Sequence, residues 1–157
     1  MSDELLEYPR RHYGMDHDRY EWSMLQDRKP VAWPGGKPLA LWINISLQHF
    51  PLSGDKPAVP PPGALTMPYP DLRHYTLRDY GNRVGIYRLL KLMAGYEASP
   101  SLAISGALAE RYPQLLARLA QTPYEWLGHG WNMLCMHAGE VDADTEAGWI
   151  ADSRQAL

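Results

Sequence analysis

Polar side chains follow the ends of three short apolar segments, and their types suit metal binding or acid–base chemistry at a carbonyl. His129 stands between Gly128 and Gly130 at the end of the stretch YEWLGHG. Glycine lets a backbone approach a ligand closely, so this spacing predicts that the imidazole of His129 lines a site. The other candidates are Asn44, Ser46, Gln48 and His49 at the end of the first segment, Ser105 after the second, and Trp131 and Asn132 after the third.

Two kinds of chemistry are open to these residues. His49 and His129 would share a divalent ion such as Zn²⁺, or one would act as a general base while the other polarises a carbonyl. His137, eight positions after His129, is a candidate second metal ligand, and an ordinary surface loop position is the alternative. Cys135 has no basic neighbour in the sequence, which favours a small buried side chain over a nucleophile.

Two of the candidates have simpler interpretations. His49 lies in QHFP, where it would only cap the strand and stack on Phe50. Arg83 lies in the helical pattern DYGNRVGIYRLL, near the expected helix start, and is a candidate to hold a carboxylate or carbonyl of a substrate. An ion pair with Asp79, one turn earlier, is the alternative for Arg83, because such pairs are common on helix surfaces.

The elements that would position these residues alternate between strand and helix patterns. Apolar segments of strand length span 39–47, 100–105 and 124–130, and helical spacing follows each of them, ending with helices over 106–121 and 141–157. We expect Thr76 to cap the first helix, Gly95 to follow its end and Pro113 to break the second. The alternation predicts an α/β fold with parallel strands and outer helices, so the strand ends meet on one face.

The domain organisation follows from the same pattern. Residues 1–38 are polar and broken by Pro and Gly, which predicts an irregular lead-in, and 51–70 are rich in proline, which predicts an extended loop. Residues 39–157 hold three strands, whereas a closed (β/α) barrel takes roughly 250 residues. The pattern therefore predicts either a small open sheet or the first half of a barrel.

Composition excludes several classes of protein. The net charge is −3 and the basic residues are not gathered in a stripe, which argues against nucleic acid as a partner. No apolar run approaches the roughly 18 residues of a membrane span, and the N-terminus lacks the apolar region of a secretory signal. One cysteine leaves no internal disulfide, so we expect a cytoplasmic protein.

Four segments together resemble one known family. WPGGKPLALWINISLQHF, YTLRDYGNRVGIYRLLKLM, ERYPQLLARLAQ and EWLGHGWNM are similar to the polysaccharide deacetylase (NodB-homology) family, in the branch with metal-independent allantoinases and related amide hydrolases. The similarity runs from about Tyr8 to the end of the chain. Members of this family fold as irregular (β/α) barrels in chains about twice as long. The resemblance thus implies the N-terminal half of a partial (β/α) barrel.

The resemblance also implies an activity. Family members hydrolyse carbon–nitrogen amide bonds, using one Asp as general base, and a second Asp with two His spaced H-x-x-x-H as metal ligands. This chain has no Asp or Glu between Leu39 and Gly54. His129 matches the first His of the pair, but Met133 stands four positions later, where the second His is expected. The ligand set for Zn²⁺ is thus incomplete, with His129 and His137 as the candidate ligands.

We therefore expect a hydrolase of small-molecule or carbohydrate amides that is incomplete or needs a partner chain, with loop 51–70 as a lid. The catalytic candidates are His129, Gln48 and Ser46, and the substrate-binding candidates are Trp131, Asn132, His49, Asn44 and Arg83. One alternative is a non-catalytic sugar- or ureide-binding module that stacks ligands on Trp42, Trp131 and Tyr80. Another is an interaction protein whose open sheet edges pair with a second copy or a complementary barrel half.

Overall fold

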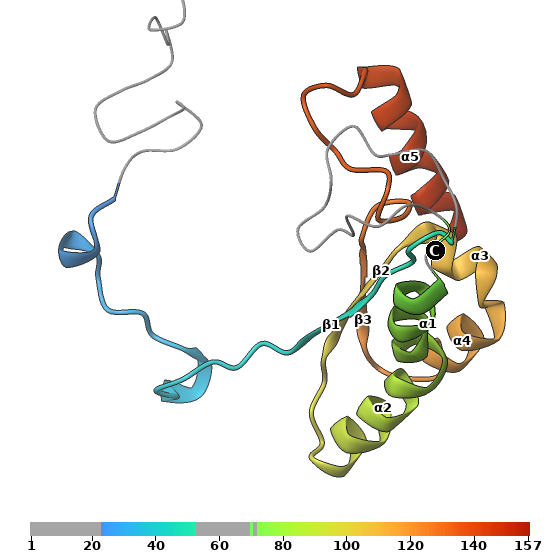
Figure 1. Cartoon of the computed structure of the whole chain (residues 1–157). Helices are drawn as coiled ribbons and strands as arrows, with labels where there is room; N and C mark the ends of the chain where they lie inside the picture. Colours follow the sequence, from blue (N-terminus) through green and yellow to red (C-terminus); the bar gives the residue numbers. More distant parts are fainter. Residues whose placement is uncertain (1–22, 53–69, 71) are drawn as a thin grey trace, which may run out of the picture. The chain divides into compact units, whose positions relative to one another are not determined.

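The computed structural model describes residues 23–52, 70 and 72–157, which belong to two units divided after Ala40 (Figure 1). In the first unit the described residues are all exposed, and their regular structure is two short 3₁₀ turns, η2 (Leu25–Asp27) and η3 (Pro34–Gly36). Most of the predicted lead-in (1–22) and of the predicted proline-rich loop (53–69) lies outside the described residues.

The second unit holds a parallel sheet of three strands, in the order β1-β2-β3 (Figure 1). The register places Asn44, Ser101 and Glu125 side by side at the start of the strands, so the strands also end level with one another. The predicted parallel pairing is confirmed. The strands are β1 (Asn44–Leu47), β2 (Ser101–Ile104) and β3 (Glu125–Gly128).

The first strand is shorter than predicted. Only Asn44–Leu47 forms β1, and Leu41 and Trp42 before it are 81% and 73% exposed. The neighbouring strand sets this limit, because β2 begins only at Ser101, whose N–H donates to the carbonyl of Ile43 at 2.9 Å. An apolar run that begins at residue 39 thus has no partner strand until residue 44.

Helices cover the sheet in the order that the sequence predicts. The first helical region is continuous from Leu72 to Gly95 and contains one π-helical turn. No helix in the described part of the chain is long and apolar enough to cross a membrane. The elements are α1 (Leu72–Tyr80), the π-helical turn η4 (Gly81–Gly85), α2 (Ile86–Gly95), α3 (Gly106–Arg111), α4 (Pro113–Leu119) and α5 (Ala143–Ala156).

The helix ends agree only in part with the expected caps. Pro113 does break the second helix, between α3 and α4. The expected cap at Thr76 is wrong, because Thr76 lies inside α1 and its hydroxyl donates to the carbonyl of Leu72 at 2.9 Å. Gly95 is the last residue of α2, and the left-handed backbone after it falls on Glu97 (φ 52°).

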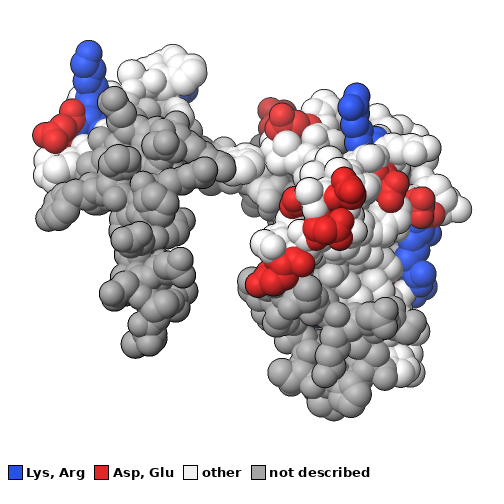
Figure 2. All heavy atoms as spheres, turned by 90° about the horizontal axis from the view of Figure 1, so that it is seen from above, with Lys and Arg blue, Asp and Glu red and all other residues white. Residues whose placement is uncertain are grey.

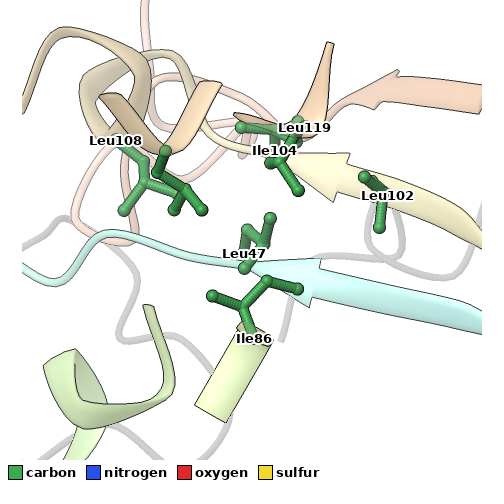
Figure 3. Close-up of a cluster of buried hydrophobic side chains, with 7 residues drawn as sticks. Leu47, Ile86, Leu102, Ile104, Leu108 and Leu119 are labelled. Carbon is green, nitrogen blue, oxygen red and sulfur yellow. The ribbon is translucent and has the colours of Figure 1, made fainter. Parts of the chain in front are cut away.

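One apolar cluster joins the sheet to the helices (Figure 3). Alternate strand residues share a face, which puts Leu47, Leu102 and Ile104 on the same side of the sheet. Ile86 of α2 meets them there, together with residues of α3 and α4. Each of these side chains stabilises the fold by roughly 1.5–3 kcal/mol when fully buried. This cluster fixes the sheet against the helices and so holds the strand ends in place.

Candidate functional site

The carboxyl ends of the three strands bring predicted site residues together. Gln48 and His129 directly follow β1 and β3, and Nε2 of Gln48 lies 2.9 Å from Nε2 of His129. An amide nitrogen can only donate, so it donates to the lone pair of His129 Nε2. This contact brings the Gln48 amide and the His129 imidazole within hydrogen-bond distance at the strand ends.

Ser105 connects the segments that follow β1 and β2. It is fully buried, and its hydroxyl accepts from the backbone N–H of His49 (3.0 Å) and donates to the carbonyl of Leu47 (3.2 Å). On the other side, the amide of buried Asn82 donates to the carbonyl of Gln48 at 2.8 Å. The backbone that carries Gln48 and His49 is therefore held from two directions.

We expect Ser105→Ala to lower the free energy of unfolding by about 1–3 kcal/mol, because it removes a buried hydroxyl that accepts from the N–H of His49 and donates to the carbonyl of Leu47. Urea unfolding measures this loss. The exposed Ser99→Ala provides the control, with a change within about 0.5 kcal/mol. Equal effects of the two substitutions would contradict the structural role of the Ser105 hydroxyl.

His49 is half-buried beside the sheet end. Burial lowers its pKa below 6.5, the positive charge of Arg111 lowers it further, and Asp79 opposes the shift. The ring is thus held in its neutral form. Its backbone also ties two loops together, since its carbonyl accepts from the N–H of Met133 at 3.0 Å.

Because the pKa of His49 is lower in the folded chain than in the unfolded one, the unfolded chain binds more protons. The stability that neutral His49 contributes should therefore be complete above pH 6.5 and decline as the pH falls through the folded-state pKa. As the pH falls below 6.5, the free energy of unfolding measured in urea should decline less for His49→Gln than for the wild type. An NMR titration midpoint of the His49 ring at or above 6.5 would refute this prediction.

The loop after β3 is fixed to the start of α3. The carbonyls of Gly130 and Trp131 accept from the N–H groups of Gly106 and Ala107, both at 2.9 Å. Gly130 needs a left-handed backbone (φ 67°) to make this turn, which explains the glycine after His129. The ring of Trp131 packs against Gly106, where an added Cβ would lie 2.8 Å from its Cε3. Trp131 thus has a packing role as well as its predicted place near the site.

Asn132 and Cys135 have structural partners in the same loop. The Asn132 side-chain oxygen accepts from the N–H groups of Leu134 (2.8 Å) and Cys135 (3.2 Å), which closes a turn. Burial raises the pKa of the Cys135 thiol, which keeps it protonated at neutral pH. Both residues still line the cavity described below.

His137 is paired with a carboxylate rather than with another histidine. Its Nδ1 lies 2.9 Å from Oε1 of Glu146, and its ring meets Trp149 edge to face with centroids 6.0 Å apart. Within residues 23–52, 70 and 72–157, no group of three or more His, Cys, Asp or Glu side chains is placed to hold a metal ion. The donors present do not fit Zn²⁺, so no step of the proposed reaction uses a metal.

Three of the predicted residues lie elsewhere. Asn44 is the first residue of β1 and so lies far from the strand's carboxyl end. Trp42 precedes β1, and its indole N–H donates to Ser101 Oγ at 3.0 Å. Arg83 lies in mid-helix with its side chain 68% exposed, and its guanidinium is 3.9 Å from the Asp79 carboxylate. The simpler interpretation of Arg83 as an ion-pair partner is confirmed.

One buried carboxylate, Asp79, belongs to a hydrogen-bonded cluster that the sequence did not predict. Both oxygens of Asp79 accept from the hydroxyl of Tyr112, at 2.6 and 2.8 Å, and Asp79 is buried. Arg111 donates to the hydroxyls of Tyr112 and Tyr75. Burial, with the hydrogen bond to Asp79, raises the pKa of Tyr112. Residues 33 positions apart leave no spacing signal, so sequence alone could not pair them.

A cavity of about 880 Å³ lies beside β3 and extends to α5. Its lining combines His129 and the His137–Glu146 pair with apolar side chains of the strand and the helix. The lining residues used below are Trp126, Gly128, His129, Asn132, Cys135, His137, Glu146, Ile150, Arg154 and Leu157.

Comparison with known proteins identifies the fold. No protein-family model and no curated protein sequence matches the chain. The structure is similar to the crystal structure of PuuE allantoinase, with a TM-score of 0.70 and 18% sequence identity. The match covers 89% of this chain and 49% of that chain, so this chain spans about half of the allantoinase. The predicted fold class, a partial (β/α) barrel with parallel strands and outer helices, is confirmed.

Proposed function

We propose that this chain is a hydrolase of non-peptide carbon–nitrogen bonds, acting in the cytoplasm on a small-molecule or carbohydrate amide. The observation that carries this proposal is the contact between Gln48 and His129 at the carboxyl ends of parallel strands. In open and closed α/β folds this is the face where substrates bind. The similarity in fold to an allantoinase supports the same class of reaction.

The proposed reaction uses the neutral His129 as general base. Nε2 of His129 takes a proton from water while the water oxygen attacks the amide carbon. The side-chain N–H of Gln48, released from His129, donates to the carbonyl oxygen as negative charge develops on it. The imidazolium then returns its proton to the leaving nitrogen as the carbon–nitrogen bond breaks. Ser46 lies on the same face of β1, two residues before Gln48, and its hydroxyl would orient the water.

The site lacks a carboxylate from β1, because no Asp or Glu occurs between Leu39 and Gly54. The proposed hydrolysis therefore needs groups from a second polypeptide, which is either another copy of this chain or a complementary barrel half. Nucleic acid is not a proposed partner, since basic side chains form no continuous patch on the face shown in Figure 2.

The test is to incubate the full chain with allantoin and, separately, with N-acetylglucosamine oligomers, at low and high protein concentration. We expect ring opening of allantoin or release of acetate. If a second copy completes the site, the rate of product formation should rise more steeply than in proportion to the protein concentration. Zn²⁺ is added to a parallel series. Absence of product under every one of these conditions would contradict the proposal.

The lack of an acidic residue over residues 39–54 also favours a second candidate, a ureide- or sugar-binding module. Calorimetry with the same compounds separates the two, because saturable binding without turnover supports the module. The predicted stacking surface needs revision in either case. Trp42 lies by the start of β2, whereas Trp131 follows the end of β3, so they do not share one surface.

A further inference from the structure

Both edges of the sheet present unpaired backbone groups. The N–H of His129 donates to the carbonyl of Ile104 at 2.9 Å. Because every second residue of a parallel strand bonds to a given neighbour, Trp126 and Gly128 direct their backbone groups away from β2. Among the described residues, nothing pairs with this edge of the sheet.

The same reasoning defines the edge of β1. The N–H groups of Ser101 and Ser105 donate to the carbonyls of Ile43 and Leu47, at 2.9 and 3.1 Å. Odd-numbered residues of β1 therefore face β2, and Ser46 directs its N–H and carbonyl outward. No strand in the described ranges lies against this edge either.

Apolar side chains extend from both edges. The 880 Å³ cavity borders Trp126 and Gly128 of β3, and its other wall is α5, where Ile150 is 55% exposed. A cavity of about 230 Å³ borders β1 and reaches Leu89 of α2. Exposed apolar surface next to an open strand edge is typical of a surface that another chain covers.

A second copy of this chain fits the direction of the strands at both edges. The outer edge of β3 can be continued in parallel by the outer edge of a β1, and a two-fold axis along the strands would make both such junctions at once. The order would then be β1-β2-β3-β1-β2-β3, which leaves no edge. The match covers 49% of the solved allantoinase chain, so two copies of this chain together have about the length of that one chain.

We propose that two copies of this chain close a six-stranded parallel barrel, with β3 of each copy paired to β1 of the other. The cavity beside β3 then receives the partner's β1, and Ile150 of α5 and Leu157, which follows α5, pack over the junction. The carboxyl ends of all six strands meet at one mouth, so the Gln48–His129 contact of each copy faces that of the other. The site is incomplete in a single copy.

Sedimentation velocity of the full chain over a wide range of concentration tests this inference. We expect a species of twice the 17.8 kDa chain mass. Ser46→Pro removes an outward N–H from an edge strand, where proline is tolerated, and should weaken the dimer at least about tenfold. Ile150→Glu puts a charge in the junction and should weaken it to a similar degree.

Ala117→Glu is the matched control, since it adds the same charge at an exposed position of α4, on neither edge. It should leave the dimer unchanged. Circular dichroism and melting curves verify that each variant is folded; if Ser46→Pro unfolds, Ile150→Glu decides. The inference is overturned if the chain is a monomer at every concentration or forms an oligomer of another stoichiometry. It is also overturned if neither Ser46→Pro nor Ile150→Glu weakens the dimer. A dimer without hydrolysis would refute only the proposed function.

Discussion

Alanine at position 106 is expected to destabilise the chain by about 1–3 kcal/mol, although it adds only a methyl group. A Cβ on Gly106 would lie 2.8 Å from the Cα of Ser153 in α5 and 2.8 Å from Cε3 of Trp131. The contact with Ser153 is to backbone, so it is relieved only when α5 moves away from α3. Urea unfolding measures the loss, and tryptophan fluorescence should report the shift of Trp131.

Gly148→Ala is the matched control for this prediction. Gly148 lies inside α5, and a Cβ there would meet nothing within 4 Å. Alanine should therefore stabilise the helix by roughly 0.5–1 kcal/mol, which is the opposite sign. If both substitutions stabilised the chain, the close approach of α3 and α5 at Gly106 would be disproved.

The second large effect concerns catalysis. His129→Asn should lower kcat/KM for the proposed hydrolysis by about 10²–10⁴-fold, because asparagine cannot accept the proton from water. Asparagine is close in size to histidine and keeps a polar group next to Gln48, so stability should change little. Gln48→Ala should reduce kcat, because it removes the N–H that donates to the carbonyl oxygen of the substrate.

His74→Asn is the control for general loss of histidine, since His74 lies on α1 and does not line the cavity beside β3. It should leave kcat/KM unchanged. Full activity of His129→Asn would remove His129 from the reaction and leave the choice of base open to His137, which Glu146 orients. The pH profile of His137→Asn would then decide.

Local patterns predicted the elements because each depends on residues close in sequence. The break at Pro113 follows from a single residue. The parallel sheet follows from the alternation of strands and helices. The meeting of Gln48 and His129 then follows from the sheet, since both stand just past a strand end.

Features that depend on distant partners could not be predicted in this way. The start of β1 is set by the start of β2, which is distant in the sequence, and this is why Asn44 was expected at the wrong end of the strand. The hydrogen bond between Asp79 and Tyr112 joins two helical regions, and no local sequence pattern around either residue predicts the other as its partner. The packing of Trp131 on Gly106 likewise exists only once α3 and the loop after β3 are side by side.

The π-helical turn between α1 and α2 has a consequence for how this chain tolerates change in length. A wide turn holds one residue more than regular α-helical winding, and here it carries Asn82, which holds the carbonyl of Gln48. Deleting one residue from Gly81–Gly85 would restore regular winding, and because the wide turn already absorbs the extra residue, α1 and α2 would keep their relative orientation. Asp79 and Ile86 would both stay buried, and the cost of the deletion would fall on Asn82, whose hydrogen bond to the carbonyl of Gln48 depends on the shape of this turn.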